Sequence, residues 1–419
     1  MKSVEWGPLE GNFWCDIKTF IINAVNYAFE HQRLPISQRL GIVSIIPKGD
    51  KDKRFLTNWR PLTLLNTLYK IISGCIAERI KPILNDIIHP DQKGFVAGRY
   101  IGEAIRTTFD TLHYAKANNL PGLLLTIDFQ KAYDSINFGF IIKCLKFFNF
   151  SSDIITWVRI LLSDFKAVVN HCGNIGDSFN IERGCRQGDP FASYLFILCI
   201  EILAHKLRTD PGVKGFDFMI NDKDNPNDSL THLLEIYADD LSVFMSPSEE
   251  NLQAVIEILN RFYMVSGLKI SATKTKAVWF GSKIGCGERL CPGLGLQWVS
   301  SFTLLGVEFD SSLTLMHSNF TNKLAKMERM LSSWAYRYMT PYGRVTIIKS
   351  LGLSMLSHLA LVLPNPSKYD IKKIESSLFR FLWEGKPDKI RRDDSKLHQK
   401  QGGIGMPDVA NFWTAFKFS

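Results

Sequence analysis

The stretch LLEIYADDLSVF, residues 233–244, places two adjacent aspartates, Asp239 and Asp240, between two apolar segments. Its length and its apolar–acidic–apolar order predict two strands joined by a turn, with both carboxylates at the turn. Burying an isolated carboxylate is costly unless a cation or a hydrogen-bond donor accompanies it. A pair of aspartates also occurs in ordinary polar turns, so a second acidic segment is needed to decide between a binding site and a simple turn.

A second acidic residue follows another apolar segment. LLLTIDF, residues 123–129, predicts a buried strand that ends at Asp128. Taken alone, Asp128 could equally be a metal ligand or an ordinary acid at the end of a strand. Three carboxylates that converge at strand ends repel one another unless cations are present. Mg²⁺ prefers oxygen ligands, commonly one or two carboxylates with substrate phosphates. Two such ions about 3.5–4 Å apart stabilise the attacking and leaving oxygens of a displacement at phosphorus.

The composition is that of a globular chain of more than one domain, with 419 residues, 46% hydrophobic and 22% charged. The N-terminal sequence MKSVEWGPLEGNF shows no signal peptide, and the apolar run FASYLFILCI before Glu201 is too short to span a bilayer. The cysteines form no CxxC pair, and Cys286 and Cys291 have no histidine beside them. We therefore predict an intracellular protein, nuclear or cytoplasmic, without a transmembrane segment, a membrane partner or a zinc site.

The positive charge is concentrated at one end of the chain. From Phe320 to Ser419 there are 17 Lys and Arg residues against 8 Asp and Glu, whereas the remaining residues hold 33 of each sign. This excess predicts contact with a polyanion, with a solvated helical surface as the alternative. The densest cluster is KPDKIRRDDSK, residues 386–396, which contains Lys389, Arg391 and Arg392.

Periodicity and turn residues predict the element order. Helices are expected at 13–31, 62–84, 101–117 and 249–266, strands at 40–48, 121–129, 276–281 and 301–309, and mostly helix after residue 320. Asp134 and Asp189 are expected to cap helices, with Pro190 as a first helical residue. Residues 221–229 read as a polar surface loop, and the composition changes near residues 120 and 315.

Three segments resemble successive polymerase motifs of reverse transcriptases, most nearly those of non-LTR (LINE-type) retrotransposons. They are TIDFQKAYDS (126–135), RGCRQGDP (183–190) and YADD (237–240). The resemblance extends over about residues 30–415. Its further blocks are SIIPKGDKDKRFLTNWRPLTLLNTLYKIIS (fingers), QKGFVAGR (before the first acid), SGLKISATKTK (after the acidic hairpin), FTLLGVEF (primer grip), and GRVTIIKS and KIESSLFRFLWEGKPDKIRR (thumb).

The resemblance implies an α+β right-hand polymerase. Its fingers would comprise residues 1–120 with part of 140–200 interleaved, its palm, with an antiparallel sheet, residues 121–315, and its basic helical thumb or connection residues 316–419. It implies an RNA-directed DNA polymerase that adds dNTPs to a primer 3′-OH on an RNA template. The partners would be the RNA template, a DNA primer and dNTPs.

The resemblance also assigns site residues by position. Asp128, Asp239, Asp240 and the backbone of Phe129 would hold two Mg²⁺ ions, with Mn²⁺ as a substitute. The remaining assignments are Lys48 and Arg60 for the incoming triphosphate, Tyr133 for exclusion of a 2′-OH, Gln187 and Gly188 beside the templating base pair, and Lys274 as a proton donor to pyrophosphate. Lys276 is close enough in sequence to leave the last choice open.

Two features depart from the family pattern. EWGPLEGNFW stands where relatives carry a Pro-Gly-x-Asp-Gly-like segment, and no endonuclease precedes it. We therefore expect a polymerase segment whose endonuclease or other element domains belong to a longer protein, or a truncated copy. The alternatives are a catalytically silent RNA-binding protein derived from a retroelement and a viral-type RNA-dependent RNA polymerase. Such polymerases place an acid where this chain has Tyr133, which argues against the second alternative.

Overall fold

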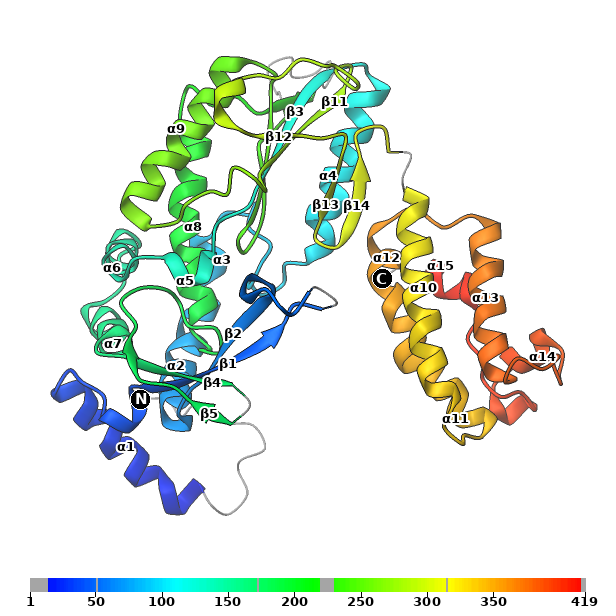
Figure 1. Ribbon diagram of the computed structural model, residues 1–419, viewed down its shortest axis with the longest axis horizontal. Coiled ribbons are helices and arrows are strands. Elements are labelled where there is room, and N and C mark those ends of the chain that lie inside the picture. Colours follow the sequence, from blue (N-terminus) through cyan, green and yellow to red (C-terminus); the bar gives the residue numbers. More distant parts are fainter. Residues whose placement is uncertain (1–13, 50–51, 172, 219–229, 314–315, 416–419) are drawn as a thin grey trace.

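The computed structural model describes residues 14–49, 52–171, 173–218, 230–313 and 316–415 (Figure 1). Five strands form the central sheet, in the order β12–β11–β3–β10–β9. They are β3 (Pro121–Ile127), β9 (Leu234–Tyr237), β10 (Asp240–Met245), β11 (Lys276–Gly281) and β12 (Gln297–Trp298). Neighbouring strands are antiparallel except β11 and β12, which are parallel. The predicted α+β class with an antiparallel central sheet is confirmed.

Both faces of the central sheet are covered. Helices α6 (Phe138–Phe147), α8 (Ala192–Thr209) and α9 (Glu249–Ser266) belong to the core on one face. The core on the other face includes α4 (Ile101–Ala117) and the hairpin of β13 (Ser301–Leu304) and β14 (Val307–Asp310). Leu123 and Leu125 of β3 lie in the first core and Leu124 in the second. Two-sided burial therefore explains why this strand is a continuous apolar run.

A second sheet lies near the N-terminus, where β1 pairs with β2 on one side and with β4 on the other. Its strands are β1 (Leu40–Pro47), β2 (Trp59–Leu64), β4 (Lys166–His171), β5 (Asn174–Ile175) and β6 (Phe179–Asn180). The helices of this region are α1 (Trp14–Glu30), α2 (Thr67–Ile80), α3 (Leu84–Ile87) and α7 (Ser152–Leu162). A small separate pair is formed by β7 (Phe216–Phe218) and β8 (Leu230–His232). A segment from the middle of the sequence thus completes the N-terminal sheet.

The prediction of a helix from residue 62 is wrong at its start. β2 continues to Leu64, and α2 begins only at Thr67, because the side chain of Asn66 accepts a hydrogen bond from the Leu68 N–H and caps the helix. The predicted helices at 13–31, 101–117 and 249–266 are confirmed as α1, α4 and α9. The predicted polar loop at 221–229 lies outside the described residues.

Two predicted helix caps are also wrong. Asp134 lies within the short helix α5 (Ala132–Ser135) rather than at the start of α6, which Asn137 precedes. The N-cap of α8 is Phe191, so Pro190 lies before the helix. Asp189 still accepts a hydrogen bond from the Phe191 N–H at 3.0 Å, but its carboxylate is also bound to other side chains, and these hold the turn ahead of the helix.

The C-terminal residues form a helical unit, as predicted. Its helices are α10 (Met316–Ala335), α11 (Pro341–Ile347), α12 (Ser354–Val362), α13 (Lys368–Leu382), α14 (Arg392–Lys396) and α15 (Val409–Ala415), with a π-helical segment, Ile348–Leu353, between α11 and α12. Thr340 caps α11, and a capping box at Ser367 starts α13.

In the described part of the chain, one helical stretch, Pro341–Val362, is long and apolar enough to cross a membrane, with a mean hydropathy of 1.6. Its most apolar window is 44% buried. Leu356, Leu359 and Ala360 are buried in the same core as α4 and α10. Because core helices pass the same test, packing is a sufficient reason for this composition.

The hairpin of β13 and β14 is bound to the helical unit. The side chain of Asn319 on α10 donates to the Glu308 carbonyl and accepts from the Glu308 N–H, both at 2.8 Å. The Nε2 atom of His358 on α12 lies 3.2 Å from the Leu305 carbonyl at the hairpin tip and donates to it. Burial lowers the pKa of His358, which favours this neutral, donating form.

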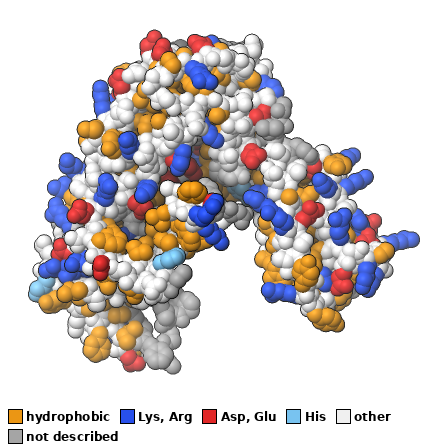
Figure 2. Space-filling model, in the orientation of Figure 1, with side chains coloured by type: hydrophobic (Ala, Val, Ile, Leu, Met, Phe, Trp, Pro, Cys, Tyr) orange, Lys and Arg blue, Asp and Glu red, His pale blue; other side chains and the backbone are white. Residues whose placement is uncertain are grey.

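The molecule is arched (Figure 1). The central sheet lies at the top of the arch, the N-terminal sheet forms one side, and the helical unit forms the other. Figure 2 shows a deep hollow between these two sides, with Lys and Arg side chains along its border. Helices α10 and α12 lie on the side of the helical unit that is nearer the hollow, whereas α14 lies on the outer side.

Candidate active site

The hairpin of β9 and β10 carries the two adjacent aspartates, as predicted, but only Asp239 lies in its turn, because Asp240 is the first residue of β10. Tyr237 pairs with Asp240, which leaves Ala238 and Asp239 as the turn residues. Ala238 has a left-handed φ of 55°, an uncommon conformation for a residue with a side chain. The buried side chain of Gln92 supports it, since its Oε1 accepts from the Ala238 N–H at 2.9 Å. Gln92, which lies outside the hairpin, therefore stabilises the strained backbone conformation of the turn.

Gln92 was not identified as a functional residue from the sequence. It opens the segment QKGFVAGR, and its amide oxygen also accepts from the Gly94 N–H at 2.8 Å. A side chain at Gly94 would clash with the turn, because a Cβ there would lie 2.6 Å from the Ala238 nitrogen. The glutamine–glycine spacing was the available signal, but nothing in the sequence shows which turn it supports.

Asp128 lies directly after β3, and its backbone carbonyl accepts from the Ser271 N–H at 2.7 Å. Its Oδ1 atom is 3.5 Å from the Nζ atom of Lys274, an ion pair between two partly exposed side chains. The same Oδ1 atom is buried and has no hydrogen-bond partner. An orphaned carboxylate oxygen of this kind is suited to a cation ligand.

The three carboxylates influence one another electrostatically. Burial, and then the charge on Asp128, raises the pKa of Asp239. Asp240 reaches solvent at the pocket, yet desolvation by the surrounding protein, followed by the charges on Asp239 and Asp128, raises its pKa to about 6. These shifts are the expected result of desolvation, reinforced by like charges brought together at strand ends.

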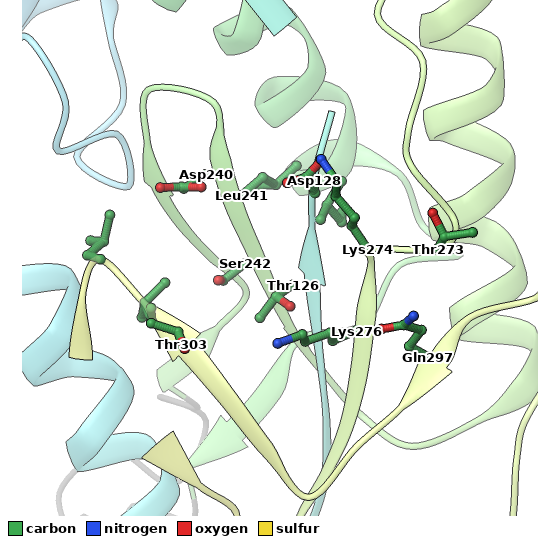
Figure 3. Close-up of a pocket in the computed structure, with 13 residues that line it drawn as sticks. Thr126, Asp128, Asp240, Leu241, Ser242, Thr273, Lys274, Lys276, Gln297 and Thr303 are labelled. Carbon is green, nitrogen blue, oxygen red and sulfur yellow. The ribbon is translucent and has the colours of Figure 1, made fainter. Parts of the chain in front are cut away.

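Asp128, Asp240 and Lys274 line one pocket of about 330 Å³ between the central sheet and the β13–β14 hairpin (Figure 3). Within the residues that the structure describes, no group of three or more His, Cys, Asp or Glu side chains is already arranged to hold a metal ion. Mg²⁺ usually takes only one or two carboxylates and obtains its other ligands from phosphates and water. The donor set of this pocket fits that mode.

Tyr133 lies between the acidic turn and α8. Its ring stacks on Phe196, with centroids 4.4 Å apart and planes at 19°. Burial, and then the charge on Asp239, raises its pKa, so the hydroxyl is neutral. Phe129 is buried and forms an isolated antiparallel β-bridge with Ile270. The two hydrogen bonds of this bridge are accepted by the carbonyls of Lys269 and Asp128, so neither uses the Phe129 carbonyl.

The loop that contains Gln187 and Gly188 rests against β2. The Gln187 carbonyl accepts from the Thr63 N–H at 3.0 Å. Gly188 has a φ of 114°, and a Cβ there would lie 2.5 Å from the Thr63 carbonyl oxygen. Glycine is therefore required for this close approach.

A buried polar network holds the same loop from below. Asp189 accepts from the Tyr69 hydroxyl at 2.8 Å and also from Ser73. Arg186 donates to Tyr69 and, at 2.8 Å, to the Leu161 carbonyl. The guanidinium carbon of Arg186 also lies 3.5 Å from the centroid of the Phe165 ring. The sequence analysis missed Arg186 and Tyr69, because an arginine beside a turn gives no sign that it is buried.

Lys48 and Arg60 lie on the β1–β2 hairpin, apart from the pocket that contains Asp128. Lys48 donates to the Thr57 carbonyl at 2.9 Å, and its charge reaches Asp134. Arg60 is exposed on β2, opposite Ile46. The structure therefore brings Asp128, Asp239, Asp240, Lys274 and Tyr133 into one region but places these two cations on the other sheet.

The densest basic segment, residues 386–396, has a setting that the sequence did not show. It lies at α14, on the outer side of the helical unit (Figure 1). Arg392 is paired with Asp388 at 2.8 Å, and Glu375 is 3.9 Å away, so part of its charge is already balanced. On α10, which lies on the side nearer the hollow, Lys326 and Arg329 are exposed on the face opposite the buried stripe.

Residues 46–309 match the family described as reverse transcriptase (RNA-dependent DNA polymerase). The chain is similar to the transposon TX1 uncharacterized 149 kDa protein of Xenopus laevis, with 28% identity over 402 residues that cover 94% of this chain and 29% of that protein. It is also similar to the retrovirus-related Pol polyprotein from type-2 retrotransposable element R2DM of Drosophila melanogaster, with 23% identity over 393 residues that cover 91% of this chain and 35% of that protein. The chain spans about a third of the length of these curated relatives.

Among solved structures, the chain aligns with the telomerase of Candida tropicalis in complex with a TWJ fragment of telomeric RNA. The alignment covers 97% of this chain and 64% of that chain, at 14% identity and a TM-score of 0.48.

We expect Asp240→Asn to raise the thermal stability of the metal-free protein, and to do so more at about pH 7.5 than at about pH 5. The folded-state pKa of Asp240 is raised from 3.8 to about 6, so the folded protein holds this proton more tightly than the unfolded chain. The resulting loss of stability is absent at low pH and grows as the pH rises through that interval. Melting in the presence of a chelator at both pH values measures the effect. Asp86→Asn, at an exposed residue of α3, is the control, and an equal gain at both pH values would contradict the assignment.

Proposed function

The chain belongs to the reverse transcriptase (RNA-dependent DNA polymerase) family, and on that premise we propose that it adds deoxynucleotides to the 3′-OH of a DNA primer while copying an RNA template. The observation that supports this most directly is the environment of Asp128. One of its carboxylate oxygens is buried without a hydrogen-bond partner, next to two further carboxylates whose pKa values are raised. The Lys274 ammonium, 3.5 Å from that oxygen, can balance only one of the three carboxylates, so the group favours a further cation. The relatives extend well beyond the matched region, so the proposal concerns the polymerase unit.

The residues present fit two Mg²⁺ ions, with Mn²⁺ as a substitute. Asp128, Asp239 and the backbone carbonyl of Phe129 would hold them, with Asp240 beside them. When bound, the ions activate the primer hydroxyl and stabilise the charge that develops on the leaving pyrophosphate. The contribution of the chain is to fix its carboxylates at the ends of buried strands, so that they cannot relax away from one another.

The other assignments give each side chain one task. The ring of Tyr133, held by its stacking on Phe196, would meet a ribose 2′-OH and so select deoxynucleotides. Gln187 and Gly188 would let the backbone approach the templating base pair. Lys48 and Arg60 would clasp the triphosphate from the β1–β2 hairpin, Arg60 through its bidentate fork.

The proposed proton donor to pyrophosphate is Lys274. Its ammonium lies 3.5 Å from Asp128, beside the reacting centre. Lys276 lies opposite Thr126 in the strand register, and Thr126 is two residues before Asp128 on β3. Lys276 is therefore farther than Lys274 from the acidic residues. The pairing supports the choice of Lys274 that the sequence left open.

The division into domains follows from the same proposal. The N-terminal sheet and its helices would form the fingers, residues 1–120 with part of 140–200. The central sheet would form the palm, residues 121–315, and the helical unit the thumb, residues 316–419. The hollow between the two sides of the arch would then receive the template–primer duplex (Figure 2).

We expect Asp239→Asn to lower primer extension on poly(rA)·oligo(dT) with Mg²⁺ by at least about 100-fold, because a lost metal ligand removes several kcal/mol of transition-state stabilisation. Folding and nucleic-acid binding should be retained, since the substitution removes a repelling charge. Extension and duplex affinity are measured side by side on the wild type, this variant and the exposed-site control Asp86→Asn. Extension near the wild-type rate would remove Asp239 from the metal site.

We expect Tyr133→Ala to shift the choice of sugar toward ribonucleotides and to lower catalytic efficiency, because the ring that meets the 2′-OH is removed. Tyr133→Phe keeps the ring and its stacking on Phe196, so it should retain the wild-type preference. Single-nucleotide addition of dNTP and rNTP by the three proteins gives the ratio of kcat/KM values. If the ratio is the same for the alanine variant and the wild type, another residue excludes the ribose.

The charge on the proposed thumb gives a further prediction. Reversing Lys326 and Arg329 of α10 to glutamate should weaken duplex binding equally for unrelated sequences. It should also flatten the salt dependence, by a slope of roughly 0.7–0.9 for each lost phosphate contact. Reversing Lys389 and Arg391, on the outer side, is the matched control and should have little effect. Affinity over a salt series measures both. A larger change for the outer pair would place the nucleic-acid contact at the segment that the sequence first indicated.

A further inference from the structure

A row of polar residues crosses the whole central sheet, two residues away from Asp128 on β3 and from Asp240 on β10. The strand registers pair Gln297 with Lys276, Lys276 with Thr126, Thr126 with Ser242, and Ser242 with Glu235. Residues that are directly paired in a sheet project from the same face. The strands are otherwise largely apolar, so five polar residues at one level are not explained by packing.

Four of these five residues line the pocket that also contains Asp128 and Asp240. In Figure 3 the ammonium of Lys276 reaches across β3 beside Thr126, on the side of the pocket where Ser242 and Thr303 lie. Residues 303–305 of the β13–β14 hairpin form the facing wall. The fifth member, Glu235, is buried and faces His232, 3.3 Å away, at the far edge of the sheet.

Lys276 has no ion-pair or hydrogen-bond partner among the residues that the structure describes, unlike its neighbour Lys274, which pairs with Asp128. Within the same described residues, the hydroxyls of Thr126 and Ser242 also lack a protein partner. A cation and two hydroxyl donors on one pocket floor are the groups that bind a phosphate oxygen. The negative charges of Asp128 and Asp240 lie at the other end of the pocket, so an anion is favoured only at the Lys276 end.

The spacing indicates which phosphate would bind. Thr126 lies two residues behind Asp128 on β3, and Ser242 two residues behind Asp240 on β10, a separation of about 6.6–6.8 Å along a strand. Successive phosphates of one nucleic-acid strand are separated by a comparable distance. A primer whose 3′-OH lies at Asp128 therefore has its last phosphodiester over the polar row.

We propose that Lys276, with the hydroxyls of Thr126 and Ser242, binds the last phosphodiester of the primer strand and so positions the 3′-OH at Asp128. The inference rests on the proposed polymerase function and adds a positioning site to it. The phosphates of the incoming nucleotide are the other source of the same chemistry. Of the residues assigned to those phosphates, Lys48 and Arg60 lie on the other sheet, and Lys274 lies beside Asp128 at the opposite end of the pocket from Lys276 (Figure 3). This arrangement leaves the Lys276 end to the primer strand.

The test combines a protein variant with a neutral primer linkage. Single-nucleotide addition is measured with primers that carry a methylphosphonate either at the last linkage or at one well upstream. For the wild type, the neutral last linkage should lower kcat/KM by at least about ten-fold, the value of a charge-assisted contact. For Lys276→Met the all-phosphate primer should already show this loss, and the neutral last linkage should cost little more. Lys276→Arg, which keeps the charge, should restore most of the wild-type response.

The controls separate the alternatives. Lys143→Met, at an exposed lysine of α6, should respond to both primers as the wild type does, and the upstream linkage should affect all proteins equally. If Lys276→Met keeps the full ten-fold penalty at the last linkage, or changes only the KM for dNTP, the inference is overturned. If the wild type extends no primer, the polymerase function fails instead. Equilibrium binding of the same duplexes then still tests the phosphate contact, because the wild type and Lys143→Met, but not Lys276→Met, should discriminate against the neutral last linkage.

Discussion

The repulsion among three carboxylates at one end of a buried sheet is the interaction on which the other features of this chain depend. Asp128 ends a strand that is buried on both faces, and Asp239 and Asp240 follow a strand of the same sheet. Because the apolar residues behind them lock the strands in register, the carboxylates cannot move apart to lower their energy. Burial, and then the charges on the neighbouring aspartates, raise the pKa values of Asp239 and Asp240, as this confinement requires. The apolar cores are therefore what make a cation site of residues that would separate in a flexible loop.

The elements nearest the acidic residues could be predicted because each carries a local pattern. The YADD hairpin, the β3 strand and α9 were recognised from apolar runs, helical periodicity and caps that lie within a few residues of one another. The start of α2 was missed because its cap, Asn66, lies inside one apolar run that β2 and α2 share. The role of Asp189 was missed because it depends on contacts with the distant residues Tyr69 and Ser73. Gln92 belongs to the same class, since its partner Ala238 lies far along the sequence.

The polar row could not be read from the sequence for a related reason. Each of its members is an ordinary residue in its own strand, and only the registers bring them to one level. A shift of one residue in any strand would turn that side chain to the other face. Charge counting at the C-terminus is incomplete for a similar reason, because it gives the number of cations but not the direction in which they point. Arg392 adds to the count while its charge is partly balanced by Asp388 and Glu375.

The β13–β14 hairpin connects these separate observations. One of its sides forms a wall of the pocket that contains Asp128, and its backbone is bound to the helical unit through Asn319 and His358. A displacement of the helical unit would therefore be transmitted to the pocket wall by direct hydrogen bonds rather than through a flexible linker. On this view the grip on the duplex and the position of the primer end are mechanically coupled. The helical unit that would hold the duplex backbone also sets the width of the space in which the last primer phosphate would lie.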